Sequence, residues 1–200
     1  MVAPATEDEM VLAFLRAEID SSRFSGPLLA ALAEQGLDRA IIDRPDSSDP
    51  EENEARRRAL AAYRGYGRND ALFAGLPDDI SWSWVALTPA ELADVRYIAW
   101  DYWLEVSDGT RRPLKAIARM RSEWDVEGSV TRTMAEAAAR GSLPPEIIVV
   151  GRPLGEGLVV LEGHVRLTGL LLRPGHLPRE VRVLLGTSPR IAEWGNYGSS

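Results

Sequence analysis

The chain contains no cysteine in its 200 residues, and Lys115 is the only lysine among its 23 basic residues. Without thiols the protein has no disulfides, no cysteine nucleophile and no thiolate metal ligands. Histidine is scarce as well, with two residues. Because transition-metal sites in proteins are built largely from cysteine and histidine, we expect no such site here.

Long apolar runs are also missing. No run reaches the roughly 18–20 residues that span a bilayer, so we expect no contact with a membrane. Residues 1–9 are acidic and lack the basic region and apolar stretch of a secretory signal. These features together predict a cytoplasmic protein.

Positive charge is short in the first part of the chain. Residues 1–80 carry 16 acidic and 9 basic side chains, whereas residues 81–200 carry 14 of each, which gives a net charge of −7. The run Arg56-Arg57-Arg58 lies beside glutamates at helical spacing, which predicts a solvated, ion-paired helix face. Because no basic stripe is present, we expect no binding to duplex DNA.

Residues 1–80 show the periodicity of helices. In residues 8–21 apolar side chains recur every three or four positions. Asp49 followed by Pro50 is typical of a helix start, with the acid as cap and the proline in the first turn. The sequence therefore predicts a helical N-terminal region over residues 1–80. Its predicted helices cover residues 8–21, 26–42 and 51–66.

Residues 81–200 mix strand and helix patterns. Thr88-Pro89-Ala90-Glu91 is a helix-start signature. Residues 95–106 are rich in β-branched and aromatic types, which favours a strand and leaves a helix as the alternative. We therefore predict an α+β fold, with a small mixed β-sheet and flanking helices in this part of the chain. The predicted strands are residues 82–87, 147–150, 158–161 and 180–185, and the predicted helices are residues 113–124, 130–140 and 165–172.

The most informative segment joins a strand to a helix through Glu162, Gly163, His164 and Arg166. The glycine allows a sharp turn, and the free amides at a helix N-terminus attract anions. Arg166 in the first turn can add a bidentate phosphate contact. His164 can exchange a proton near neutral pH. An ordinary strand-to-helix turn is the alternative interpretation of the same residues.

This segment resembles the strand–Glu/Asp-Gly-His-x-Arg–helix element of the ParB/sulfiredoxin-like superfamily. The preceding residues are similar to the helix, glycine, proline and strand that come before this element in the superfamily. They are Met134–Arg140, Gly141, Leu143-Pro144-Pro145 and Ile147–Val150. The resemblance is strongest over residues 130–185 and extends to roughly 84–190, so the predicted fold of residues 81–200 is ParB/sulfiredoxin-like.

Members of this superfamily bind nucleotide phosphates at the corner, as CTP switches, as ATP-dependent sulfiredoxins or as free-serine kinases. The resemblance implies that Gly163, Arg166 and Thr168 contact phosphate. It also implies that Glu162 and His164 assist magnesium binding or proton transfer, with ATP or another NTP and Mg²⁺ as cofactors. Because His164 stands where sulfiredoxin has its catalytic cysteine, sulfiredoxin chemistry is excluded.

Two further segments are candidate anion sites. Ser107-Asp108-Gly109-Thr110-Arg111 combines hydroxyls, a glycine and an arginine before a helix. By the resemblance, Arg111 would approach the nucleotide together with Ser107 and Thr110. The loop 186–190 follows the last strand and ends at Arg190. A capped turn and a helix cap are the respective alternatives.

These observations leave two classes of function open. The first is a nucleotide-binding enzyme, an NTP-dependent phosphotransferase that acts on a small-molecule acceptor, or an NTPase. The second is a non-catalytic ParB-like binding or regulatory module with a protein partner. Either class is compatible with a homo-oligomer. A DNA-linked role fits the charge distribution least well.

Overall fold

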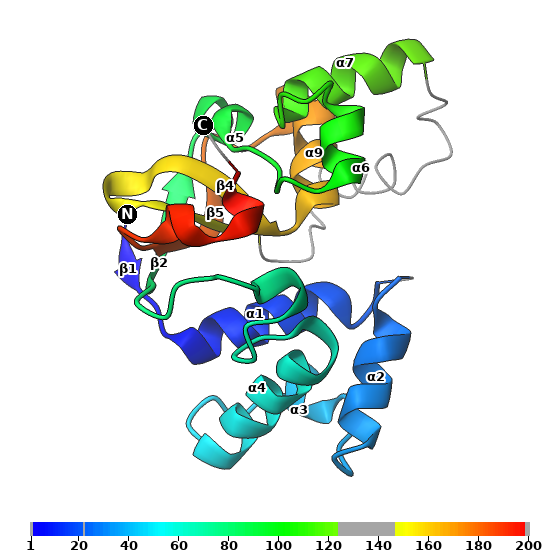
Figure 1. Cartoon of the computed structure of the whole chain (residues 1–200), viewed down its shortest axis with the longest axis vertical. Helices are drawn as coiled ribbons and strands as arrows, with labels where there is room; N and C mark the ends of the chain where they lie inside the picture. Colours follow the sequence, from blue (N-terminus) through cyan, green and yellow to red (C-terminus); the bar gives the residue numbers. More distant parts are fainter. Residues whose placement is uncertain (1, 22, 124–146, 199–200) are drawn as a thin grey trace.

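The computed structural model describes residues 2–21, 23–123 and 147–198 of the chain. In this part a five-stranded mixed sheet lies between two groups of helices (Figure 1). Helices from the first half of the chain lie on one side of the sheet, and helices from residues 89–172 lie on the other. The predicted α+β class is confirmed.

The strand order is β1-β2-β5-β3-β4. Strand β3 runs parallel to β5, and the remaining neighbours are antiparallel. Because Ala3 pairs with Trp84, the start of the chain belongs to the same sheet as the C-terminal strands. The strands are β1 (Ala3–Pro4), β2 (Ser81–Leu87), β3 (Ile148–Arg152), β4 (Glu156–Glu162) and β5 (Val181–Thr187).

Two helices of residues 1–80 begin at local capping signals. The Thr6 side chain accepts from the Glu9 amide, and Glu9 accepts from the Thr6 amide, so a capping box opens α1. The Asp49 side chain accepts from the amides of Glu51 and Glu52 and opens α4 as predicted. The elements are α1 (Glu7–Glu18), α2 (Ser25–Ala33), α3 (Ala40–Asp43), α4 (Pro50–Arg64) and the 3₁₀ turn η1 (Ala71–Phe73).

One predicted helix of this region is wrong in extent. Residues 26–42 form two helices, because α2 ends at Ala33 and α3 begins at Ala40. Gly36 between them has a φ of +70°, a left-handed conformation that glycine adopts without strain and that an α-helix cannot contain. The break turns the chain so that α3 contacts both α1 and α4.

The prediction for Arg56 is also wrong. Its side chain is 1% exposed, and its guanidinium donates to the carbonyl oxygens of Ile41 and Asp46 and to the side chains of Glu52 and Asn53. Arg56 therefore holds the 41–46 loop to α4, whereas a solvated face was expected. The neighbouring Arg57 and Arg58 do form the predicted ion pairs with Glu54.

On the other side of the sheet, Thr88 opens α5 with the predicted capping box. The strand favoured over residues 95–106 is wrong, since residues 101–106 form α6 and only Arg96 makes an isolated bridge with Val159. Trp103 and Val106 share the buried face of α6, three residues apart, so burial decides between strand and helix here. The elements are α5 (Pro89–Asp94), α6 (Asp101–Val106), α7 (Pro113–Glu123) and α9 (His164–Leu172).

The last third of the chain follows the predicted order of strand, strand, helix and strand. The predicted helix 130–140 and the residues around Gly141 lie outside the described residues. Short 3₁₀ turns complete the fold: η3 (Pro153–Gly155), η4 (Pro174–His176), η5 (Ile191–Glu193) and η6 (Gly195–Tyr197).

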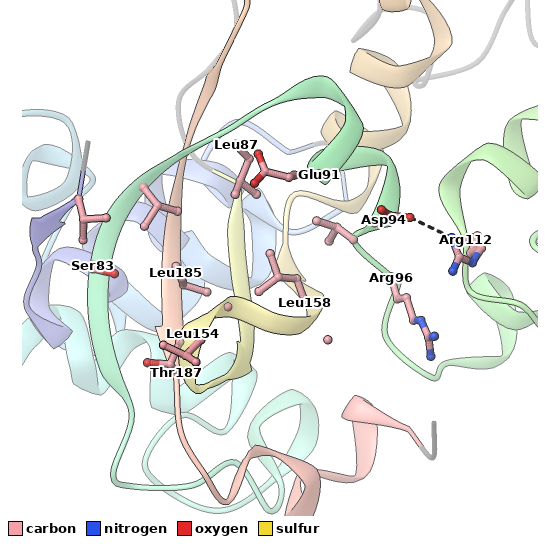
Figure 2. A pocket seen from close by; sticks show the side chains of 15 residues that line it. Ser83, Leu87, Glu91, Asp94, Arg96, Arg112, Leu154, Leu158, Leu185 and Thr187 are labelled. Carbon is pink, nitrogen blue, oxygen red and sulfur yellow. Dashed lines mark hydrogen bonds and ion pairs between the residues drawn. The ribbon is translucent and has the colours of Figure 1, made fainter.

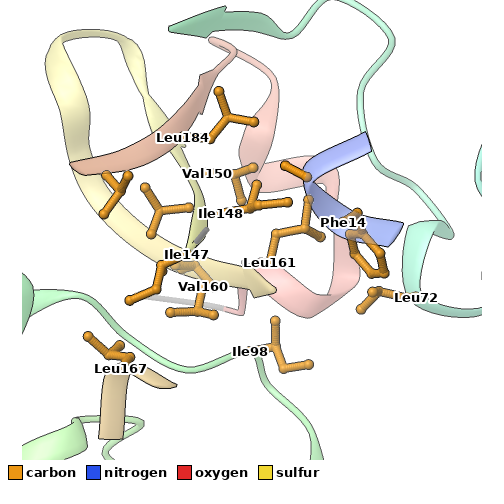
Figure 3. Packing of buried hydrophobic residues seen from close by; sticks show 14 of the residues in the cluster. Phe14, Leu72, Ile98, Ile147, Ile148, Val150, Val160, Leu161, Leu167 and Leu184 are labelled. Atoms are coloured by element: carbon orange, nitrogen blue, oxygen red, sulfur yellow. The ribbon is translucent and has the colours of Figure 1, made fainter. Parts of the chain in front are cut away.

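The core joins both groups of helices to the sheet. Phe14 of α1 faces Ile148 and Val150 on one side (Figure 3), and Leu167 of α9 belongs to the same buried cluster as Val160. All of these side chains are essentially inaccessible to solvent. The proposed boundary near residue 80 stays a prediction, and the core is continuous across it. Within the described residues, the helices are too short or too polar to cross a bilayer.

Candidate functional site

The corner between β4 and α9 has the predicted strand–glycine–helix geometry. Strand β4 ends at Glu162, and α9 begins at His164. Between them Gly163 has a φ of +97°, which is strained for any residue with a Cβ. A Cβ there would lie 3.2 Å from Ile147 Cγ1 and 3.3 Å from Arg166 Nε. The corner therefore needs glycine for its backbone conformation and for space.

Across the first turn of α9, Arg166 pairs with Glu162. The Arg166 Nη2 atom donates to Glu162 Oε1 at 2.7 Å, and the side chains are 7% and 16% exposed. Within the described residues, no hydrogen bond or ion pair uses the Arg166 Nε or Nη1 atoms. Arg166 thus retains N–H donors that can bind an anion while Glu162 holds its other nitrogen.

The N-terminal helices bring more charge to this corner. Glu18 at the end of α1 is 1% exposed and accepts hydrogen bonds from Tyr63 and from Arg64 at the end of α4. The guanidinium of Arg64 also lies 3.8 Å from the ring centroid of Phe24. Burial and the negative charge of Glu18 raise the pKa of Glu162, Arg166 and Arg64 oppose this, and the resulting pKa is about 7. Glu18, Arg64, Glu162 and Arg166 are therefore one electrostatic cluster, here called the corner cluster.

Sequence reasoning did not find the N-terminal members of the corner cluster. One signal was present, because Glu18 continues the apolar spacing of Met10 and Phe14 on α1. A carboxylate on the buried stripe of a helix needs a partner. Nothing in the sequence shows that this partner is Arg64, which lies 46 residues away.

His164 is buried and packs against the rings of Trp103 and Tyr97, which also contact each other. Its imidazole stacks on Trp103, with centroids 5.0 Å apart and planes at 17°, and more loosely on Tyr97 at 6.1 Å. Burial, together with the positive charges of Arg166 and Arg64, lowers the pKa of His164 to about 3. The ring is therefore neutral at physiological pH. Its Nε2 atom is buried without a hydrogen-bond partner among the described residues.

Thr168 lies one turn further along α9. Its hydroxyl donates to the His164 carbonyl at 2.8 Å and is 2.6 Å from the Tyr97 hydroxyl. Thr168 is 1% exposed and Tyr97 is fully buried. These hydrogen bonds hold α9 against the segment before α6. Thr168 thus stabilises the position of the helix that forms the corner.

The second candidate segment forms a layer behind the corner. Arg111 Nε donates to the Tyr97 carbonyl at 2.7 Å, and the Ser107 hydroxyl donates to the Trp103 carbonyl. Thr110 donates to the Ser107 carbonyl. Within the described residues, no hydrogen bond or ion pair joins these three side chains to residues 162–166. Arg111 and Ser107 thus hold the backbone of Tyr97 and Trp103, and the rings of these two residues contact His164.

The side chains of the third candidate segment, residues 186–190, make hydrogen bonds and ion pairs that stabilise the fold. The Ser188 hydroxyl donates to Asp79 and accepts from the Arg190 amide, so it caps the η5 turn. Arg190 pairs with Asp78 and Glu193. This is the helix-cap arrangement given as the alternative for residues 186–190.

The corner cluster offers phosphate donors and one carboxylate that can ionise near neutral pH. Magnesium is held in nucleotide sites by one or two carboxylates together with phosphate oxygens. Among the described residues no group of three or more acidic or histidine side chains is placed to hold a metal ion. Glu18 is committed to Arg64 and Tyr63, and Glu162 to Arg166, so a Mg²⁺ ion at this corner would be held mainly by phosphate oxygens.

Comparison of the chain with protein-family models, with curated proteins and with solved structures gave no match. The similarity to ParB/sulfiredoxin-like proteins therefore stays a prediction based on residues 162–166 and their surroundings.

Proposed function

We propose that this protein binds the phosphates of a nucleoside triphosphate at the corner between β4 and α9. The observation that carries the proposal is the position of Arg166 at a helix N-terminus. It is nearly buried, it is fixed by Glu162, and within the described residues two of its nitrogens make no hydrogen bond. The amides of the first turn of α9 and these nitrogens together favour a multivalent anion. The ParB/sulfiredoxin-like resemblance supports the same assignment.

The proposed reaction is phosphoryl transfer to a small acceptor or to water, with Glu162 as general base. A base works best when its pKa is near the working pH, and the pKa of Glu162 is about 7. Glu162 takes the proton of the attacking hydroxyl, the new O–P bond forms at the γ-phosphorus, and the bond to the bridging oxygen breaks to release the diphosphate. Mg²⁺ supplies charge neutralisation for the phosphates.

His164 has a different part in this proposal. With a pKa of about 3 it is a weak base at neutral pH. Its Nε2 atom has no hydrogen-bond partner among the described residues and, directly after Gly163, suits a neutral hydrogen bond to the ligand. We therefore place proton transfer on Glu162 and ligand contact on His164.

A non-catalytic binding module is the second candidate function. It is favoured by two aromatic side chains of the α6 region, Trp100 and Tyr102, which are 38% and 49% exposed. Exposed aromatic residues are enriched in protein interfaces. The two candidates differ in one property, which is turnover of the nucleotide.

Phosphorus NMR of MgATP mixed with the purified protein tests the enzymatic proposal. We expect the γ-phosphate signal to convert to that of inorganic phosphate, because water takes the place of an acceptor that this mixture does not contain. Glu162→Gln should slow this by about 100-fold or more while MgATP still protects the variant against thermal unfolding. Glu180→Gln, at an exposed position, is the matched control and should retain the wild-type rate. Equal rates in wild type and Glu162→Gln, or no conversion by wild type, would contradict the proposed reaction.

A further inference from the structure

A groove of about 710 Å³ lies over the start of β4, away from the corner at its end. Its floor is apolar, and the side chains come from β2, β5, β4 and the residue after α5 (Figure 2). They are Val85, Leu87, Val95, Leu158 and Leu185. Clefts of about 300–1,000 Å³ with such linings bind small molecules. The groove therefore has the size and the floor of a small-molecule site.

Arg96 supplies an uncompensated positive charge to this groove. Its amide donates to the Leu158 carbonyl and its carbonyl accepts from the Val160 amide, each at 2.8 Å, so its backbone is fixed against β4. Within the described residues, its guanidinium makes no hydrogen bond or ion pair. By contrast, Arg112 in the same lining pairs with Asp94 at 3.0 Å (Figure 2).

The remaining acid of the lining is already used. Glu91 accepts from the Thr88 amide and from the Thr88 hydroxyl at the start of α5, both at 2.7 Å. Its negative charge thus already interacts with the N-terminus of α5. Asp94 is paired with Arg112. Among the described residues that line the groove, Arg96 is therefore the charged side chain without a hydrogen bond or an ion pair.

The Tyr197 hydroxyl lies beside the groove, next to Gly157. A Cβ at Gly157, which lines the groove, would overlap the Tyr197 hydroxyl, so glycine lets the phenol approach the strand. No hydrogen bond of this hydroxyl occurs within the described residues. Burial raises the pKa of Tyr197, and the positive charges of Arg152, Arg96 and Arg111 oppose this. The positive charges of these three arginines therefore lower the pKa of Tyr197, and the negative charge of Glu156 raises it.

We propose that this groove binds a small amphipathic anion, with its apolar body on the Leu158–Leu185 floor and one carboxylate or phosphate group at Arg96 and Tyr197. The guanidinium supplies paired N–H donors that match either group, and the phenol supplies one more donor. The floor excludes water from the apolar body and contributes the hydrophobic part of the affinity. This site is separate from the nucleotide corner and does not depend on it.

Calorimetric titration of the full chain with octanoate, octyl phosphate, octanol and inorganic phosphate tests the proposal. We expect octanoate or octyl phosphate to bind, and the tighter of the two identifies the charged group. Octanol and inorganic phosphate each lack one half of the ligand and should bind at least about tenfold more weakly. Saturating MgATP should leave these affinities unchanged.

Variants of Arg96 and Tyr197 test whether the groove binds the charged group of the ligand or only its apolar part. Arg96→Gln should weaken binding by about tenfold or more and Tyr197→Phe by a smaller factor. Arg179→Gln, at an exposed arginine away from the groove, is the matched control and should bind like wild type. Circular dichroism verifies the fold of each variant. The proposal is overturned if neither anion binds, if octanol binds as tightly as octanoate, or if Arg96→Gln binds like wild type.

Discussion

Arg166 donates a 2.7 Å hydrogen bond to Glu162 across Gly163 and the first turn of α9. The glycine makes this contact possible, because a Cβ at position 163 would press on Arg166 Nε. Burial of the pair has a second effect, since it raises the pKa of Glu162 into the physiological range. The backbone geometry of Gly163, the position of Arg166 and the raised pKa of Glu162 are therefore linked at one turn.

Replacement of Gly163 tests the backbone part of this link. Gly163→Ala should lower the free energy of unfolding by about 2–3 kcal/mol, from the left-handed φ and from the contacts with Ile147 and Arg166. Gly36→Ala is the matched control, because Gly36 also has a positive φ and its Cβ would meet nothing within 4 Å. It should lose only about 1 kcal/mol. Urea denaturation measures both, and equal losses would show that position 163 is not crowded.

The raised pKa of Glu162 predicts a pH dependence of stability. The folded state holds the Glu162 proton up to about pH 7, whereas the unfolded state releases it near the ordinary value of 4.5. At Glu162 the folded state therefore binds more protons than the unfolded state over this window, and the contribution of Glu162 to the free energy of unfolding falls as the pH rises from about 4.5 to 7. The loss is on the order of 3 kcal/mol, at about 1.4 kcal/mol for each pH unit between the two pKa values.

Glu162→Gln removes this contribution. Urea denaturation of wild type and variant at pH 5, 6, 7 and 8 gives the difference between their unfolding free energies. This difference should move in favour of Glu162→Gln as the pH rises. The buried, neutral His164 acts in the opposite direction below pH 6.5, but it is common to both proteins and cancels. A difference that is constant over this range would mean that Glu162 titrates normally.

The ion pair of Glu18 and Arg64 is a structural requirement of the corner cluster. Glu18→Ala leaves a largely buried guanidinium without its carboxylate, which should cost about 3 kcal/mol or more. Replacing both residues with leucine should recover much of this loss. Asp43→Ala breaks the exposed pair with Arg39 and should change stability hardly at all. Chemical denaturation of these variants would contradict this interpretation if Glu18→Ala and Asp43→Ala were equally stable.

Local signals allowed much of the fold to be predicted. The helix starts at Thr88 and Asp49 depend on side chains within three residues of the cap, so they can be recognised without a tertiary structure. The turn at Gly163 is equally local. By contrast, residues 101–106 have strand-forming side chains and form a helix, because packing of Trp103 and Val106 outweighs intrinsic preference.

The candidate site could be predicted only in its contiguous part. Glu162, Gly163 and Arg166 lie within five residues, and their pairing follows from helix spacing. The contribution of Glu18 and Arg64 depends on how α1 and α4 pack against the sheet, which no short-range pattern encodes. Arg96 was missed for the same reason, since its significance depends on the absence of a partner in a groove formed by distant strands.

Calorimetric titration with MgATP tests the central claim, that Arg166 forms a triphosphate site at this corner. We expect wild type to bind MgATP, and Arg166→Gln to bind at least about tenfold more weakly because a charge-assisted hydrogen bond is lost. Arg173→Gln is the control, at an exposed arginine at the end of the same helix, and should bind like wild type. Equal affinity of wild type and Arg166→Gln, or no binding of MgATP by wild type, would contradict the assignment of this corner as a nucleotide site.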